Sequence, residues 1–142
     1  MKINTGVLIP VERDGEHVGE LHLDPSDVVF AERVYDIISY FKDRQAEYEA
    51  RGAALDANKE TDEYGIPKNA REIMKLARDI CEDVMVKIDE VFGAGVSQMV
   101  FGQSRSFDAI SEFLEEVGIS LEAAQNERIK KYTNRAQRRS LK

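Results

Sequence analysis

Few residues in this chain carry catalytic or metal-binding chemistry, and their spacing brings none of them together. The two histidines, His17 and His22, stand at odd and even positions of one extended segment, so we expect them on opposite sides of it. The one cysteine, Cys81, falls on an apolar helical stripe, where a free cysteine packs as a small hydrophobe. A single cysteine cannot complete the usual zinc sites. We therefore expect no metal site and no cofactor.

Paired carboxylates and a glycine-rich turn are the other features that could do chemistry. The pairs Glu82-Asp83, Asp89-Glu90 and Glu115-Glu116 fall on predicted helices, where adjacent side chains point apart, so solvated helix faces explain them better than acid–base catalysis. Gly93-Ala94-Gly95 follows a helix rather than a strand, and Gln98 stands where a dinucleotide-binding loop needs its third glycine. These glycines predict a helix cap and a tight turn. Without a nucleophile, a base and an orienting group, the chain is not expected to be an enzyme.

Charge is divided unevenly along the 142 residues, whose net charge is −7. Seven basic and two acidic residues from Ser120 onward give that segment a charge of +5, which leaves −12 for the rest. An acidic body repels nucleic acid and membrane surfaces, so neither is an expected partner, although a basic tail attracts polyanions. No apolar run approaches the roughly 18 residues of a membrane span. One cysteine and no signal-peptide pattern favour the cytoplasm.

The first half of the chain predicts a hairpin followed by a helix. Apolar residues on both sides of an Asp14-Gly15 turn predict a β-hairpin within residues 1–25. A lone hairpin is marginal in water, so it has to pack on another element or add strands from another subunit. Asp24 or Ser26 is expected to cap a first helix, whose apolar face begins at Phe30 and fades near residue 48. Residues 52–67 are weakly patterned and predict a mobile connection.

The second half predicts helices throughout. An apolar stripe of helical period covers residues 70–92 and ends at Gly93, and one or two further turns are expected at 96–101. A short helix is expected at 107–117, stopped by Gly118, and from Ser120 another helix frays into the basic tail. The predicted fold is mainly α, with amphipathic helices in one small domain over residues 1–119 and an N-terminal β-hairpin at 1–25. Residues 120–142 are predicted to be a basic, partly helical or disordered tail.

Apolar side chains gather around the glycine turn between the predicted helices. They are costly to leave exposed, so they either complete the core, which is the commoner outcome, or form a protein-docking surface. The docking surface is the candidate site, and it comprises Phe92, Gly93, Gly95, Met99, Phe101 and Gly102.

Two short motifs flank this turn. Residues 87–95 read Lys-Ile-Asp-Glu-Val-Phe-Gly-Ala-Gly and residues 100–102 read Val-Phe-Gly, followed by the short helix at 107–117 and the basic segment 132–139. This order resembles the tail assembly chaperones of long-tailed, non-contractile phages of Gram-positive bacteria. A glutamate is common in that family where Ala94 stands.

The resemblance implies a function without catalysis, in the host-cell cytoplasm. Such chaperones bind the tape measure protein, keep its hydrophobic helices soluble, help to recruit tail tube protein, and are not part of the mature virion. The family often makes a longer product by ribosomal frameshifting, which depends on nucleotides rather than residues. A homo-oligomer formed through the hairpin edge would fit this role.

Two other functions fit parts of the sequence. A small regulatory or nucleic-acid-binding module would act through the basic tail, and its binding would weaken steeply with salt. A structural phage component, such as a tube or connector protein, would need more strand than residues 1–25 provide.

Overall fold

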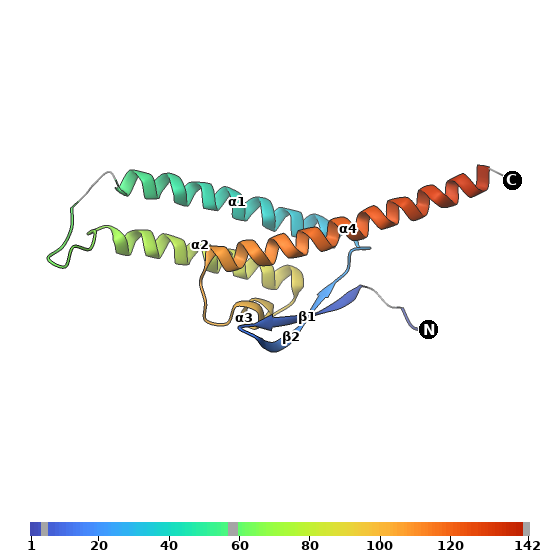
Figure 1. Ribbon diagram of the computed structural model, residues 1–142, viewed down its shortest axis with the longest axis horizontal. Coiled ribbons are helices and arrows are strands. Elements are labelled where there is room, and N and C mark those ends of the chain that lie inside the picture. The colour runs from blue at the N-terminus through green and yellow to red at the C-terminus, as the bar shows by residue number, and fades with distance from the viewer. Residues whose placement is uncertain (4–5, 57–59, 141–142) are drawn as a thin grey trace.

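In the described part of the chain, residues 1–3, 6–56 and 60–140, the computed structural model contains four helices and one two-stranded sheet (Figure 1). The predicted mainly helical fold with an N-terminal hairpin is confirmed. The elements in chain order are β1 (Val7–Arg13), β2 (Glu16–Leu23), α1 (Val28–Asp56), α2 (Ala70–Phe92), α3 (Val96–Phe101) and α4 (Phe107–Ser140).

The hairpin turns at the predicted position. Asp14 and Gly15 have φ angles of 54° and 82°, and two successive positive values make the type I′ turn that matches strand twist. β1 and β2 pair antiparallel, with a register shift between Val11 and Glu12. Leu21 and Leu23 of β2 are buried, so one face of the hairpin packs on the helices.

The start of α1 differs from the prediction that Asp24 or Ser26 caps it. Asp27 is the cap, since its carboxylate accepts the backbone N–H groups of Val29 at 2.9 Å and Phe30 at 3.3 Å. The Ser26 hydroxyl instead donates to the Asp24 carboxylate, and the Asp27 N–H donates to the Asp24 carbonyl. Asp24 and Ser26 therefore belong to the turn that precedes the helix.

The connection after α1 is shorter and more regular than predicted. α1 continues to Asp56, and residues 60–68 form a closed turn in which Lys68 N–H donates to Glu60 O at 2.9 Å. The Asp62 carboxylate accepts the N–H groups of Tyr64 and Ile66, which explains how a weakly patterned segment acquires a defined backbone. Residues 57–59, also part of the predicted mobile connection, lie outside the described residues.

The core lies where α1, α2 and the first half of α4 meet the hairpin. α1 and α2 lie side by side and antiparallel, with α4 across them and the hairpin and α3 below one end (Figure 1). The predicted α2 and its end at Gly93 are confirmed. The residues of α2 and α4 that are buried in this core are Ile80, Cys81, Val84, Met85, Ile88, Ile110, Phe113, Leu114, Val117 and Leu121.

The prediction that Gly118 stops a short helix is wrong, because α4 runs through it to Ser140. A Cβ at Gly118 would lie 3.5 Å from Ile38 Cδ1, so the glycine lies directly against α1. A helical glycine costs about 1 kcal/mol relative to alanine. Leu121, one turn later, is fully buried, and its burial contributes about 1.5–3 kcal/mol, which outweighs that cost.

The last part of α4 leaves the body of the molecule. Gln125 Nε2 donates to the Pro25 carbonyl at 2.5 Å, and beyond it the helix continues into solvent (Figure 1). None of the described α4 residues after Leu121 is buried. We call residues 122–140 the basic arm. The arm belongs to the segment predicted as a basic tail, and it is helical.

Candidate functional site

The phenylalanines of the predicted docking turn are largely part of the core. Phe101 is 5% exposed, and its ring stands edge-on to Phe113 with the centroids 5.5 Å apart. Phe92 is half-buried and makes the same kind of contact with Phe113 at 5.6 Å and with Phe30 at 5.5 Å. Of the two interpretations that the sequence left open, core completion describes Phe101, and Phe92 is partly covered as well.

The glycines between α2 and α3 form the predicted cap and tight turn. Gly93, with φ of 125°, ends α2 by donating its N–H to Asp89 O at 3.0 Å, and Gly95, with φ of 84°, precedes α3. The Asp89 carboxylate accepts the Ser97 N–H at 2.8 Å. Asp89 is therefore more than a solvated helix-face residue, because it ties the end of α2 to the start of α3.

Met99 and Gly102 hold the hairpin against α3. A Cβ on Gly19 would lie 2.1 Å from Met99 Sδ, so any larger residue there would displace the Met99 side chain from its place against the hairpin. Arg13 Nη1 donates to the Met99 carbonyl at 2.6 Å and to the Gln98 carbonyl at 3.2 Å, above the buried Gly102. The predicted turn thus positions the hairpin, and the surface it creates lies between the hairpin and α4.

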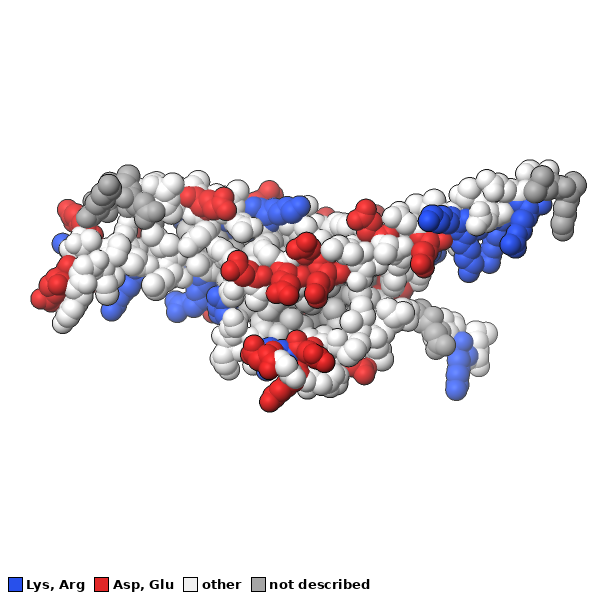
Figure 2. All heavy atoms as spheres, viewed as in Figure 1, with Lys and Arg blue, Asp and Glu red and all other residues white. Residues whose placement is uncertain are grey.

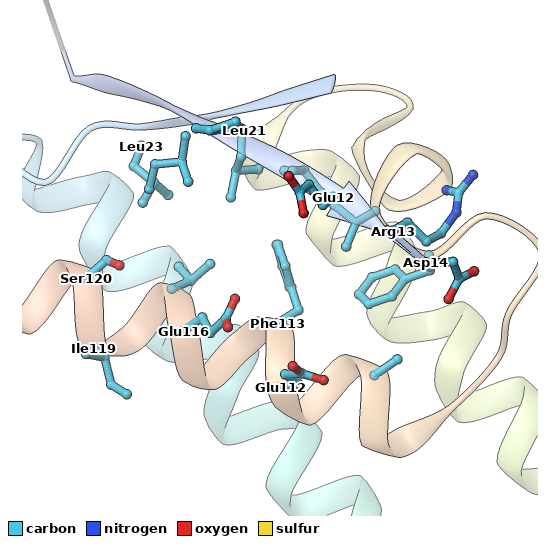
Figure 3. A pocket seen from close by; sticks show the side chains of 17 residues that line it. Glu12, Arg13, Asp14, Leu21, Leu23, Glu112, Phe113, Glu116, Ile119 and Ser120 are labelled. Atoms are coloured by element: carbon cyan, nitrogen blue, oxygen red, sulfur yellow. The ribbon is translucent and has the colours of Figure 1, made fainter. Parts of the chain in front are cut away.

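That surface is a groove of about 570 Å³ between β1 and the first half of α4. Phe113 rises from α4 toward the hairpin, where Leu21 lies (Figure 3). Ile9, Val11 and Val100 are partly exposed and extend its apolar surface. We call this surface the acidic groove, because its rim is charged.

Four carboxylates and one guanidinium line the groove. Glu116 stands beside Phe113 on α4, and Glu12 lies across from it on β1 (Figure 3). The Arg13 guanidinium donates to the carbonyls of α3, and its one positive charge leaves the four carboxylates in excess, so the lining keeps a net negative charge. Acidic side chains gather over the hairpin and the first half of α4, and basic ones gather on the arm (Figure 2). The four rim carboxylates belong to Glu12, Asp14, Glu112 and Glu116.

These rim residues were not among the sequence candidates. Glu112 and Glu116 are spaced four apart, which places them on one face of a helix. The α4 side of the rim could therefore have been predicted from the sequence. Glu12 is about a hundred positions away, and nothing in the sequence indicates that it faces them. Only the docking of the hairpin brings the two halves of the rim together.

The histidines and the cysteine, which could act in catalysis or bind a metal, do not lie together in one site. His17 and His22 are both exposed residues of β2. They pair with Glu12 and Leu8, which are four residues apart and so share one face of β1. The register shift therefore places both histidines on the same face of the hairpin, and the expectation that they lie on opposite sides is wrong. Cys81 is 1% exposed in the core, as predicted. Among the described residues, no three His, Cys, Asp or Glu side chains lie close enough to hold a metal ion. No helix in that part of the chain is both long enough and apolar enough to cross a membrane.

Burial raises the pKa of the Cys81 thiol above its ordinary value of 9.0. The unfolded thiol ionises first, so the stability due to this shift is complete below that value and is lost as the pH rises through the folded pKa. We expect the urea midpoint of the wild type to fall more steeply above pH 9.0 than that of Cys81→Ala. All other ionisable groups are common to the two proteins, so equal slopes would contradict a buried thiol.

Comparison with known proteins identifies a family for this chain. A family model described as a family of unknown function (DUF6673) matches residues 18–142. No curated protein and no solved structure matches the chain. The matched region contains all four described helices, so it includes the α4 wall of the groove and the basic arm. β1 precedes the matched region.

Proposed function

We propose that this chain, which belongs to the DUF6673 family, is a tail assembly chaperone that holds helical segments of a phage tape measure protein in its acidic groove. The proposal includes help in recruiting tail tube protein, action in the host-cell cytoplasm, and absence from the mature virion. The observation that carries it is the groove, whose apolar floor and carboxylate rim suit an amphipathic helix with basic flanks. The motifs at residues 87–95 and 100–102 support it by their resemblance to such chaperones.

The length of the groove suits a short stretch of helix. On α4 its lining runs from Ala109 to Ser120, which at 1.5 Å per residue is roughly 17 Å, or about three helical turns. A long helical client presents an apolar stripe that aggregates when it is left uncovered. Covering three turns at a time would shield that stripe, and the acidic exterior would keep the complex in solution.

The experiment is co-expression with the tape measure protein, followed by size exclusion with light scattering. We expect a joint complex in the soluble fraction, whereas the tape measure protein alone should be insoluble. The control is co-expression with an unrelated acidic helical protein of similar size. A tape measure protein that stays insoluble beside soluble chaperone would contradict the proposal.

A second candidate function is a nucleic-acid-binding module. The observation that favours it is the basic arm, which carries six basic and no acidic residues between positions 128 and 139 and projects away from the acidic body (Figure 2). Its binding would weaken steeply with salt and vanish on truncation after Glu127. Retention of nucleic acid by the truncated protein would contradict this candidate.

A further inference from the structure

We propose that the acidic groove of one copy of this chain binds the basic arm of a second copy. This inference needs the groove to be a docking site, as in the proposed function, but it does not need the client to be a tape measure protein. It rests on charge complementarity, on an apolar stripe that the arm leaves uncovered, and on matching lengths.

The arm carries its own docking face. Ile129 and Tyr132 are 63% and 57% exposed, and with Ala136 they follow the i, i+3, i+7 spacing of one helix face. Arg128 and Arg135 extend over the Tyr132 ring at 6.0 and 5.9 Å from its centroid, so cationic groups flank the stripe. Such a helix matches a groove that is apolar at its floor and acidic at its rim.

The dimensions of the two surfaces agree. From Arg128 to Arg139 the arm spans about 17 Å at 1.5 Å per residue, the same length as the α4 wall of the groove. The groove contributes four carboxylates, and this stretch of the arm contributes six basic groups. A helix seated between β1 and α4 would place basic side chains beside carboxylates on both walls.

The arm cannot enter the groove of its own copy. Both belong to α4, which is one unbroken helix, so Arg135 lies 23 residues and roughly 35 Å along the axis from Glu112. Folding back would require breaking the helix. The partner must therefore be another molecule, and the same chain supplies an arm at equal concentration to the grooves.

The contact joins two different surfaces, so it is heterologous. A pair joined by one such contact leaves one arm and one groove free, so further copies can add, and the assembly either closes into a ring or grows as an open filament. We therefore expect the mean mass to rise with protein concentration and to fall with salt, because the Debye length shortens from about 10 Å at 0.1 M to about 3 Å at 1 M.

The test uses light scattering on the full chain, freed of nucleic acid, with three charge variants. The arm variant is Lys131→Glu with Arg135→Glu, and the groove variant is Glu112→Lys with Glu116→Lys. The matched control for the arm variant is Lys42→Glu with Lys75→Glu, which changes net charge equally on exposed positions of α1 and α2. We expect each of the first two to associate at least tenfold more weakly than the wild type, and the control to behave as the wild type.

Mixing the arm and groove variants tests directly whether the arm of one copy binds the groove of another. Each retains the surface that the other has lost, so the mixture should recover association that neither variant shows alone. A monomeric wild type, an arm variant that associates like the wild type, or a mixture that stays monomeric would overturn the inference. Failure of client capture leaves these results unchanged, because no client is present.

Discussion

Phe113→Ala is expected to lower the free energy of unfolding by about 3–5 kcal/mol, the largest loss we expect from a single truncation. Phe113 is 8% exposed and meets both Phe92 and Phe101 edge-on, so alanine leaves a cavity and removes two ring contacts. It also forms part of the groove floor, so its loss should weaken docking as well as stability. The measurement is urea unfolding followed by circular dichroism.

Glu112→Ala is the matched control for that truncation. Glu112 is exposed one residue earlier on the same helix, so its removal should change stability by no more than about 0.5 kcal/mol. If Phe113→Ala cost as little as this control, the aromatic cluster would not be packed as described.

Under the proposed function, the double reversal Glu112→Lys with Glu116→Lys is expected to reduce the recovery of soluble tape measure protein by roughly fourfold or more. Each exposed ion pair contributes about 0.2–1 kcal/mol, and reversal replaces two attractions with two repulsions. The binding free energy should therefore weaken by about 0.8–4 kcal/mol, and the lower end of this range already corresponds to roughly fourfold. Both side chains are exposed, so the fold should be retained. The measurement is the yield of tape measure protein that co-purifies with the tagged protein.

Glu115→Lys with Glu122→Lys provides the control for this experiment. Both residues are exposed on α4, but neither lines the groove, so the same change of net charge leaves the rim intact. Client recovery should then match the wild type. An equal loss in both variants would assign the effect to net charge and not to the groove.

Local sequence rules predicted the elements whose signals lie within a few residues. The Asp14-Gly15 turn, the apolar stripe of α2 and its end at Gly93 depend on backbone preferences and helical period, and the structure confirms them. The burial of Cys81 follows from its place on that stripe. These features need no knowledge of what packs against them.

The sequence-based predictions were wrong where the backbone preference of a residue competed with a contact made elsewhere in the fold. Gly118 has the signature of a helix stop, yet α4 continues because Leu121 is buried beyond it and Gly118 lies against Ile38 of α1. Asp27 takes the cap that Asp24 or Ser26 was expected to hold, because the preceding turn uses both of those residues. Burial free energy and turn geometry outweighed the intrinsic preference in these cases.

Sequence alone therefore determined the helical class, the hairpin and the division of charge between body and arm. The tertiary structure decided which surface is available, since it buried Phe101 and placed Glu12 of β1 across from Glu116 of α4. The physical reason is range: backbone preference acts over a few residues, whereas a groove between β1 and α4 exists only after residues about a hundred positions apart have packed together.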